Sequence, residues 1–509
     1  MTSPDQAPVV VVGAGPTGAT VSILLAQCGI KTLVLDRWAG VYPQPRAVHM
    51  DDEVCRVVAR MGLAEKFAAI SRPAHGLQLR DRDHRVLAEF RRDTAPSANG
   101  HPQANMFDQP EFEEILRAEL LAHRCVDLRG GVDVTGVEQV GDRVRVTYRD
   151  ASGAPTTVDA GFVLGCDGAN SFVRTAIGST MDDLHFDQRW LVVDVDSDAD
   201  LQQWEGVHQV CDPERAATYM RVGSTRYRWE FQLLEGESVD QFADLAAVAP
   251  FIEPWTRGVP TERLRLIRVA EYTFRAQIAD RWRRGNVFIL GDAAHLTPPF
   301  IGQGMGAGLR DADNLAWKLA GVLRGELPPN VLDSYQQERR PHARAMIRLA
   351  LAVGRAMTAG GEVGSMLRRV VVPRLGLIPG VRARITSSKT PALHRSALVG
   401  RRVGPWSLTG TLCPNPTLPD GRRVDDVLGK GFAIVTAAPL TAGQRAQAER
   451  RGVTVHVAAH GSDLARWLRR GRTTAALVRP DRTVMATARR PTDLLASTPD
   501  FGESLRASC

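Results

Sequence analysis

The residues with the clearest chemical pattern form a glycine-rich loop near the start of the chain, residues 13–18 (GAGPTG). In such a loop Gly13 permits a tight turn, Gly15 lets the backbone approach a pyrophosphate, and Gly18 lets a helix pack closely on a strand. A helix that begins at this loop would direct unpaired N–H groups at the phosphates. Asp36, 18 positions beyond Gly18, has the type and spacing of an acid that hydrogen-bonds an adenosine ribose. The pattern predicts a dinucleotide site and leaves open whether the ligand is FAD or NAD(P).

The flanking residues have the pattern of a βαβ unit that would hold this loop in place. Residues 9–12 (VVVV) are a short β-branched run, which is typical of a buried parallel strand. Residues 19–28 have helix-compatible composition up to Gly29, and residues 31–35 return as a second strand that ends at Asp36. A glycine loop between a strand and a helix is far more specific than the glycines alone.

Hydrophobic patterning divides the rest of the chain into further units. A helix is expected over residues 110–123, where proline lies near the start, and alternation predicts antiparallel strands over 132–137 and 143–148. More strands are expected over residues 191–195, 217–222, 226–233, 286–290, 432–436, 453–457 and 475–478. The simplest interpretation is a first domain that is interrupted by a sheet, resumes near residue 286 and precedes a C-terminal unit.

Composition argues against several classes of protein. No apolar run approaches the length of a membrane span, and residues 9–12 and 370–372 are among the longest. Residues 1–5 lack the basic and apolar character of a signal peptide. The seven cysteines include no C-x-x-C pair, which favours reduced thiols over a disulfide scaffold or a zinc site. We therefore expect a cytoplasmic protein with no membrane partner.

The net charge of +7 favours anionic ligands, but the basic residues are spread along the chain. The densest stretches, residues 281–284 and 466–472, each contain one tryptophan and no series of stacking aromatic residues. We therefore expect no nucleic-acid partner. No cluster of His, Asp and Glu has metal-ligand spacing, so no metal site is expected.

Two later segments refine the dinucleotide prediction by resemblance. Residues 166–174 (CDGANSFVR) and 291–295 (GDAAH) are similar to the DG and GD motifs of the group A FAD-dependent aromatic monooxygenases. The resemblance implies that Asp167 lies near the pyrophosphate and the path of a transient nicotinamide, and that Asp292 binds the ribityl chain. The three segments in this order indicate FAD as the bound dinucleotide.

A fourth segment, residues 298–304 (PPFIGQG), resembles the loop along the flavin ring in this family, and residues 311–319 resemble the helix after it. A helix that begins at about Met305 would direct its positive end at the flavin pyrimidine. It would favour the anionic reduced ring there by on the order of 1 kcal/mol. Many family members have asparagine where this chain has Gly306, so only backbone amides are expected to contact the flavin at that position.

Two more matches complete the expected FAD site. Residues 45–47 (PRA), followed by acidic residues 51–53, resemble the segment whose arginine lies near the pyrophosphate and the swinging flavin. Residues 108–110 (DQP) resemble the segment whose glutamine meets the ribityl chain. The alternatives are a surface arginine and a helix-start glutamine. The expected FAD contacts are Gly13, Gly15, Pro16, Thr17, Gly18, Asp36, Arg37, Arg46, Gln109, Asp167, Asp292, Gly302, Gln303, Gly304, Met305 and Gly306.

Within this family the chain most resembles the 3-(3-hydroxyphenyl)propionate hydroxylases, including those of actinobacteria. The resemblance rests on residues 45–47 and 51–53, on 190–195 (WLVVDV), on 211–213 (CDP) and on 335–340 (YQQERR). Antibiotic-tailoring hydroxylases of actinobacteria share many of these segments. The resemblance therefore defines the mechanism better than the substrate.

The expected fold class is α/β, with a Rossmann-like FAD-binding domain interrupted by a mixed β-sheet substrate domain and followed by a thioredoxin-like domain. The FAD-binding domain is expected over residues 1–180 and 281–390. The substrate domain is expected over residues 181–280, with strands near 76–107 added to its sheet, and the C-terminal domain over residues 395–509.

The C-terminal prediction rests on residues 477–481 (LVRPD), which resemble a strand and turn of the thioredoxin-like domain in the phenol hydroxylase branch. Residues 413–416 (CPNP) contain the single thiol of Cys413 where a working thioredoxin needs C-x-x-C. We therefore expect a structural or dimer-contacting role for this domain, and a homodimer is left open.

The resemblance implies an enzyme that consumes NADH or NADPH and O2 and hydroxylates a phenolic ring through a flavin C4a-hydroperoxide. The nicotinamide is expected to bind transiently, because no second G-x-G-x-x-G follows a strand. The substrate would be a 3-(3-hydroxyphenyl)propionate-like acid or a polycyclic aromatic natural product. The alternatives are a Baeyer–Villiger or epoxidising enzyme acting on a polyketide, a Rossmann dehydrogenase and a non-catalytic flavin-binding protein.

Candidates for catalysis are fewer than those for cofactor binding. His49, His208 and Tyr227 have side chains that could polarise a phenol, although each of these residue types is more often an ordinary sheet or loop residue. Tyr219, Tyr227 and Trp229 are expected to form the substrate pocket opposite residues 298–300, unless they belong to the core. The residues expected to act on the substrate are Tyr227, His49 and Pro298.

Overall fold

The computed structural model describes residues 6–43, 46–358 and 390–498. Several sequence expectations concern residues outside this part of the chain: residues 1–5 at the N-terminus, Pro45 of the PRA segment, the apolar run 370–372 and Cys509. Within the described part, no helix is long and apolar enough to cross a membrane.

The first sheet contains five parallel strands in the order β18-β11-β1-β2-β8, with β17 and the hairpin β9–β10 at its margins. The predicted valine strand is confirmed, since Val9, Val10 and Val11 are fully buried in β1. The strands are β1 (Gln6–Val12), β2 (Thr32–Asp36), β8 (Val126–Gly130), β9 (Asp133–Val140), β10 (Arg143–Arg149), β11 (Pro155–Gly165), β17 (Arg283–Arg284) and β18 (Val287–Ile289).

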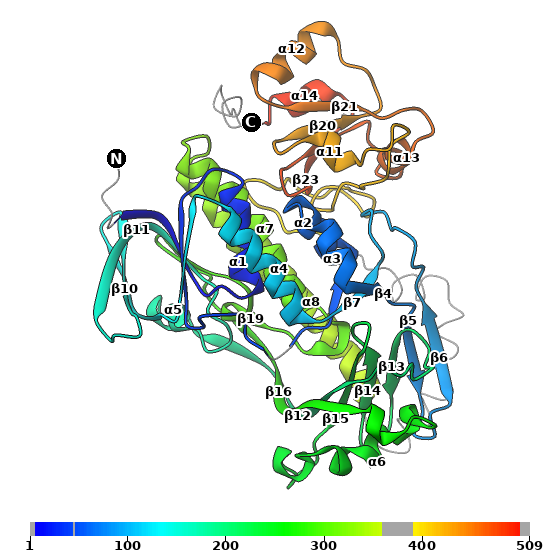
Figure 1. The fold of residues 1–509 in the computed structure, drawn as a ribbon. Helices are drawn as coiled ribbons and strands as arrows, with labels where there is room; N and C mark the ends of the chain where they lie inside the picture. Colours follow the sequence, from blue (N-terminus) through cyan, green and yellow to red (C-terminus); the bar gives the residue numbers. More distant parts are fainter. Residues whose placement is uncertain (1–5, 44–45, 359–389, 499–509) are drawn as a thin grey trace.

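Long helices pack beside this sheet, and Figure 1 shows α1, α4, α7 and α8 lying close together to its right. Helix α7 packs along α1, and α8 packs on α7. The predicted helix at residues 110–123 is confirmed as α4, and the helix expected near Met305 is confirmed as α7. The bounds are α1 (Pro16–Ala26), α4 (Gln109–Ala122), α5 (Phe172–Ala176), α7 (Gly304–Leu323) and α8 (Asp333–Thr358).

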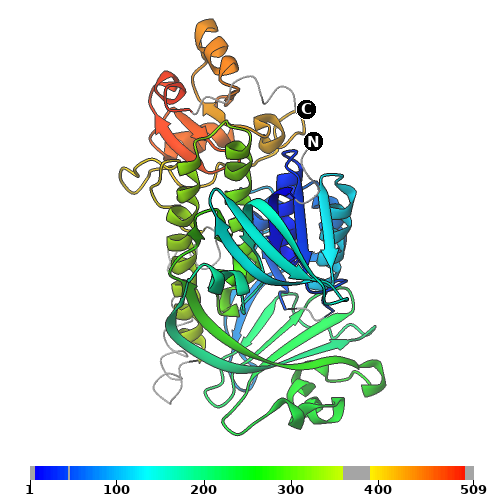
Figure 2. The ribbon, with the colours of Figure 1, turned by 90° about the vertical axis from the view of Figure 1, so that its left-hand side faces the viewer.

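The second sheet is mixed and has the order β19-β16-β12-β15-β14-β13-β5-β6. Two long antiparallel strands, β12 and β16, connect it to the first sheet, as Figure 2 shows. Strand β5 pairs parallel with β13, so a segment from the first hundred residues forms one edge. The strands are β5 (Gly76–Arg80), β6 (Val86–Arg91), β12 (Met181–Asp196), β13 (Val207–Val210), β14 (Ala217–Arg221), β15 (Arg226–Gln232), β16 (Arg265–Ala279) and β19 (His295–Leu296).

Smaller elements pack beside α1 and α4 and cover the outer face of the second sheet. A three-stranded sheet has the order β3-β7-β4, and α6 covers the second sheet on the side away from the first. These elements are β3 (His49–Asp51), β4 (Ser71–Pro73), β7 (Ala104–Phe107), α2 (Asp52–Arg60), α3 (Ala64–Ile70) and α6 (Leu245–Thr256). Single 3-10 turns are η1 (Val239–Phe242), η2 (Thr261–Arg263), η3 (Gly291–Ala293), η4 (Pro299–Ile301) and η5 (Pro329–Leu332).

The C-terminal unit has its own four-stranded sheet in the order β21-β20-β22-β23. Strand β20 is parallel to β21 and antiparallel to β22, and β22 is antiparallel to β23. The elements are α11 (Val424–Leu428), β20 (Ala433–Thr436), α12 (Ala442–Arg450), β21 (Thr454–Val457), α13 (Asp463–Arg470), β22 (Ala475–Val478), β23 (Val484–Ala488) and α14 (Pro491–Leu495). The unit lies against the ends of α2 and α7 (Figure 1).

Buried ion pairs attach this unit to the rest of the molecule. The Glu338 carboxylate of α8 lies 2.8 Å from Lys318 Nζ of α7 and 2.9 Å from Arg479 Nη1, and all three side chains are fully buried. Arg56 of α2 lies 2.7 Å from Asp425 of α11. The C-terminal unit is therefore attached by charged groups that are fully or largely buried.

Candidate active site

A cavity of about 1420 Å³ lies between the first sheet and the inner face of the second sheet. It is lined by the loop after β1, the end of β2, the turn after β11, the segment that precedes α7, and strands β12, β14, β15 and β16. A single small ligand typically occupies about 300–1,000 Å³. The cavity is therefore large enough for a dinucleotide together with a second molecule.

The glycine loop after β1 is built for close approach at both of its ends. Gly13 has φ +98°, and a Cβ at this position would overlap the Cys166 carbonyl. A Cβ at Gly18 would overlap the Gly13 carbonyl, so this glycine is needed for packing and does not line the cavity. Gly15, by contrast, has no neighbouring atom within 4 Å of a Cβ position, which leaves its backbone open to the cavity.

The next two residues of the loop begin helix α1 and also line the cavity. Pro16 is the first residue of the helix, where a missing N–H is harmless. A Cβ added to Gly291 would lie 2.6 Å from Thr17 Oγ1, so Thr17 fits against the GD segment. This arrangement brings the helix N-terminus and Asp292 to the same wall of the cavity.

Asp36 lies at the end of β2 and holds the glycine loop as well as lining the cavity. Its Oδ2 accepts a hydrogen bond from Ala14 N at 2.6 Å, and its Oδ1 accepts one from Trp38 N at 2.7 Å. Arg37 is exposed and directs Nη2 at the Asp167 carbonyl at 3.5 Å. The carboxylate keeps further lone pairs for a ribose hydroxyl.

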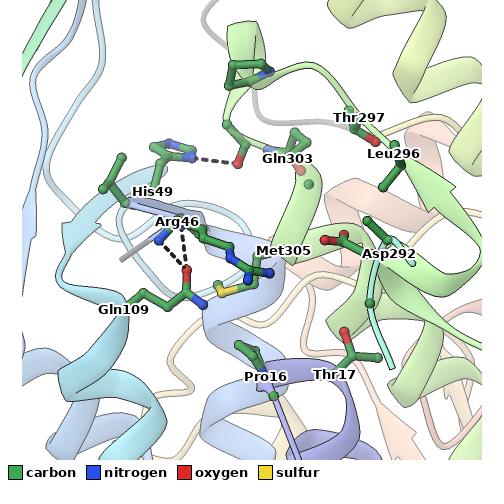
Figure 3. A pocket seen from close by; sticks show the side chains of 18 of the residues that line it. Pro16, Thr17, Arg46, His49, Gln109, Asp292, Leu296, Thr297, Gln303 and Met305 are labelled. Atoms are coloured by element: carbon green, nitrogen blue, oxygen red, sulfur yellow. Dashed lines mark hydrogen bonds between the residues drawn. The ribbon is translucent and has the colours of Figure 1, made fainter. Parts of the chain in front are cut away.

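Arg46 and Gln109 meet on the opposite wall. Gln109 Oε1 accepts hydrogen bonds from the backbone N–H groups of Arg46 and Ala47 at 3.0 and 2.5 Å, as Figure 3 shows for Arg46. Its Nε2 donates to Glu113 at 2.6 Å. The Arg46 guanidinium lies 5.1 Å from the centre of the Tyr42 ring and has no hydrogen bond or ion pair with any residue that the structure describes. An unpaired cation here fits a pyrophosphate.

The two motif aspartates differ in their surroundings. The Asp167 carboxylate accepts hydrogen bonds from Ser171 Oγ and Val173 N, so it caps the turn before α5 while also lining the cavity. Asp292 points into the cavity (Figure 3), and within residues 6–43, 46–358 and 390–498 no group hydrogen-bonds its carboxyl. Burial raises the pKa of Asp292, and His295 and Arg46 oppose this shift. This carboxyl is free to accept hydrogen bonds from ribityl hydroxyls.

The loop before α7 forms the end of the cavity nearest the second sheet. Gly302 has φ +62°, and Gln303, Gly304 and Met305 line the cavity at the N-terminus of α7. Gly306 does not line it, because its Cα faces Val54 and Arg310. The expected flavin contact at Gly306 is therefore not supported by its position.

His49 of β3 lies opposite this loop and lines the same part of the cavity. Its Nδ1 is 3.3 Å from the Gly302 carbonyl oxygen, an interaction drawn in Figure 3. Because a carbonyl only accepts, this hydrogen bond requires the proton on Nδ1 and leaves Nε2 as an acceptor. Burial, followed by the charge of Arg92, lowers the pKa of His49 to about 4. The imidazole is therefore neutral near pH 7.

Comparison with known proteins identifies the family. Residues 6–350 match the FAD binding domain family. A probable NADH-specific resorcinol 4-hydroxylase from Rhodococcus jostii is 33% identical over 507 residues, which cover 96% of this chain and 93% of the relative. The chain belongs to the FAD-dependent aromatic hydroxylases. The open Gly15 backbone, the unpaired Arg46 and the free Asp292 carboxyl fit FAD in this hydroxylase.

Two other proteins resemble this hydroxylase over most of its length. A 3-(3-hydroxy-phenyl)propionate/3-hydroxycinnamic acid hydroxylase from Mycolicibacterium smegmatis is 34% identical over 445 residues, 86% of this chain and 78% of the relative. The crystal structure of a ternary complex of aklavinone-11 hydroxylase with FAD and aklavinone has a TM-score of 0.79 at 24% identity, covering 100% of this chain and 99% of the other. The latter shows that the whole fold is shared.

The expectation that Tyr219, Tyr227 and Trp229 form the substrate pocket of the hydroxylase is wrong. These residues lie on the outer face of the second sheet, in a core cluster beneath α6. Tyr227 donates its phenolic hydrogen to the Ala199 carbonyl at 3.1 Å, so its hydroxyl cannot meet a substrate in the cavity. His208 belongs to the same cluster, where its Nδ1 accepts from Trp255 Nε1 at 3.1 Å.

Pro298 was expected beside the substrate, but it is buried and does not line the cavity of the hydroxylase. Its neighbours Thr297, Pro299 and Phe300 line the cavity instead. This turn therefore lies beside the cavity as expected, but the neighbours of Pro298 form the wall there.

The inner face of the second sheet carries polar residues that the motifs did not reveal. Asp194 of β12 lies 2.7 Å from Arg228 and 2.9 Å from Arg268, and all are nearly or fully buried. Arg228 also donates to the Arg46 carbonyl at 3.1 Å, and burial raises the pKa of Glu230 beside it. The alternation of charged and aromatic residues in β15 (RYRWEFQ) was the one signal that this face is polar.

Proposed function

We propose that the hydroxylase uses a nicotinamide donor and O2 to place one hydroxyl on a phenolic ring. The phenol would be a 3-(3-hydroxyphenyl)propionate-like acid or a larger aromatic compound, as the names of the relatives suggest. The resorcinol-hydroxylating relative is named as NADH-specific, which supports NADH as the donor. One observation carries the proposal: neutral His49 beside Gly302, with Nε2 left as a proton acceptor in the cavity.

The residues that would hold FAD follow from the geometry of the cavity. Gly15 and the N-terminus of α1 would bind the pyrophosphate together with Arg46. Asp292 would accept hydrogen bonds from the ribityl chain, and residues 302–305 would lie along the flavin ring. When bound, FAD supplies the redox chemistry and the reaction with O2.

His49 would act on the substrate rather than on the cofactor. Its Nε2 accepts the proton of the phenol hydroxyl, and the phenolate that results is a more electron-rich ring for oxygen transfer. The N-terminus of α7 presents its positive end at the same place and stabilises negative charge near it. Base and helix dipole therefore act on the same small region.

An apolar wall completes the site and excludes water from it. Trp190 of β12 lies 5.9 Å from Phe274 of β16 and 6.3 Å from Phe300, measured between ring centres, and all three line the cavity. Aromatic rings stack favourably on such surfaces. Exclusion of water matters because it protects reactive intermediates from hydrolysis and other side reactions.

The test is to purify the protein, record its visible spectrum and follow NADH and NADPH oxidation with 3-(3-hydroxyphenyl)propionate, resorcinol and larger phenols. A yellow protein whose oxidation rate rises with one phenol, and whose product is heavier by one oxygen on the ring, supports the proposal. A ring-expanded or epoxide product would replace hydroxylation by Baeyer–Villiger or epoxidising chemistry. Oxidation that no aromatic compound accelerates would overturn the proposal.

We also infer that the first sheet and its helices form the FAD-binding domain over residues 1–180 and 281–390, and that residues 181–280 form the substrate domain. The strand order and directions of the C-terminal sheet support a thioredoxin-like domain over residues 395–509. Cys413 is fully buried there, and burial raises its pKa to about 12. A thiol that stays protonated supports a structural role for this domain.

A further inference from the structure

Arg92 lines the cavity, has no ion-pair partner among the described residues and has no assigned role in the expected FAD site. Arg92 follows directly after β6, and its backbone N–H donates to the His75 carbonyl at 2.8 Å. Its side chain lines the cavity, yet among the described residues nothing hydrogen-bonds the guanidinium or lies in an ion pair with it. Because arginine stays protonated, this is a permanent positive charge in a partly buried position.

The other arginines that line the cavity do have partners or an assigned ligand. Arg228 is paired with Asp194, and Arg275 lies 3.3 Å from Asp187. Arg46 makes no ion pair either, but it lies where the pyrophosphate of FAD is expected. Arg92, by contrast, has no assigned ligand, and its charge acts on His49, beside the region expected to hold the reacting ring.

Nearby carboxylates do not satisfy Arg92, although they are close enough to influence it. Asp51 forms an ion pair with Arg310 and accepts from Val54 N at 2.9 Å. Asp52 Oδ2 accepts hydrogen bonds from the side chains of Ser97 and Asn99. Burial lowers the pKa of Arg92, and Asp51 and Asp52 only partly oppose this effect. The guanidinium has therefore lost water without gaining an ion pair, which is unfavourable until an anion binds.

The wall around Arg92 is apolar and belongs to the same part of the cavity as His49. Ala74, Ala104, Met106, Val207 and Met220 pack in one cluster and line the cavity together with Leu77. Ala74 adjoins His75, whose carbonyl accepts from Arg92 N, and Met106 lies opposite His49 in the β3–β7 pair. The charge of Arg92 is the second cause, after burial, of the lowered pKa of His49. A molecule that fills this region would therefore meet a proton acceptor, a cation and an apolar surface together.

We propose that Arg92 is a specificity-determining residue that binds a carboxylate on the phenolic substrate. The phenol hydroxyl would face His49, the ring would lie on the apolar wall, and the carboxylate would form two parallel hydrogen bonds with the guanidinium. A neutral phenol would leave the cation unpaired. This inference rests on the proposed function and refines it, because it selects an acidic phenol as the substrate class.

The test compares 3-(3-hydroxyphenyl)propionate with its neutral amide, which has nearly the same shape. The FAD-loaded wild type and the R92Q, R92K and R91Q variants are titrated with each compound, and the dissociation constant is read from the change in the visible flavin spectrum. The values of kcat and KM are measured in parallel. Arg91 is the matched control, because it is the adjacent exposed arginine and pairs with Glu89.

We expect R92Q to weaken binding of the acid by about 10- to 100-fold, the range for a hydrogen-bonded charge pair, and to leave the amide unchanged. R92K should restore part of the preference for the acid, and R91Q should not alter it. The ratio of bound FAD to protein shows that R92Q is folded. The same loss for acid and amide, or a wild type that binds both equally, would overturn the role of Arg92. Hydroxylation of either compound would still support the proposed function. A wild type that hydroxylates no phenol would overturn the proposed function itself.

Discussion

At the scale of single residues, His49 combines two properties that a proton acceptor needs. Its hydrogen bond to the Gly302 carbonyl sets the tautomer, and its lowered pKa keeps the ring neutral. A neutral imidazole with one free nitrogen can accept a proton, whereas an imidazolium cannot. The position of the ring beside the loop before α7 places this acceptor where the substrate is expected.

We predict that His49→Gln lowers kcat for phenol hydroxylation about 100-fold, at the lower end of the effect of a general base. KM should change little. Since the pKa of His49 is about 4, the wild-type kcat should not depend on this group between pH 8 and 5 and should fall below pH 5, where the imidazole takes up a proton. Steady-state assays across this pH range check both statements.

A phenol that is already ionised at the assay pH provides the sharpest control for His49. Such a substrate needs no base, so the loss in the His49→Gln variant should largely disappear with it. His456→Gln, a remote change on β21, should affect neither substrate. An equal loss for ionised and neutral phenols would show that His49 acts by shape alone.

At the scale of the elements, the loop between β1 and α1 depends on two glycines for different reasons. Gly13 has φ +98° and no room for a Cβ, because the Cys166 carbonyl occupies that space. Gly15 has φ −64°, a value open to any residue, and open space around its Cα. Gly13 is therefore needed for the fold, whereas Gly15 leaves space for the ligand.

We predict that Gly13→Ala lowers the free energy of unfolding by roughly 1–3 kcal/mol, the cost of a strained backbone, and also weakens FAD binding. Gly15→Ala should leave the stability of the FAD-free protein within about 0.5 kcal/mol of wild type, because the new methyl group meets no protein atom. It should still weaken FAD binding, since the methyl group projects toward the phosphates. Urea unfolding and flavin fluorescence titrations separate the two effects, and equal stability losses in both variants would contradict this division of roles.

Sequence patterns predicted β15 as a strand, but the expectation that its aromatic face would meet the cavity was wrong. The aromatic residues Tyr227 and Trp229 pack beneath α6, so Arg228 and Glu230 turn inward. Alternation along a strand separates two faces and cannot say which is covered by a helix. The more apolar face of β15 packs in a core beneath α6, and its polar face lines the cavity.

At the scale of the whole molecule, the C-terminal unit is attached through charge rather than through an apolar interface alone. Glu338 is fully buried between Lys318 and Arg479. Burial by itself would raise the pKa of Glu338, but the two cations outweigh it and lower the pKa to about 2. The folded-state pKa lies below the ordinary value of 4.5, so this group stabilises the fold above pH 4.5, and that stabilisation is lost as the pH falls toward 2.

We predict that Arg479→Met lowers the free energy of unfolding at pH 7 by about 3–5 kcal/mol, because a buried charge loses one partner. Part of the loss of stability between pH 4.5 and 2 should also disappear in this variant. Arg466→Met, which removes an exposed partner of Asp463, should cost less than about 1 kcal/mol. Urea unfolding at several pH values checks these values, and similar costs for the two variants would show that the buried pairs contribute no more than surface ones.

The sequence by itself predicted which segments would form the FAD site, because each of these segments is local. Gly13 and Gly15, the turn with Asp292 and the loop at residues 302–305 are short segments whose backbone needs are visible in the residues themselves. Only the tertiary structure decided the substrate side. The sequence offered His49 as a candidate but gave no signal for Arg92, and these residues, more than 40 positions apart, line one cavity because segments from separate sheets form its wall. Which face of β15 lined the cavity depended on where α6 packed, a long-range contact that no local pattern contains.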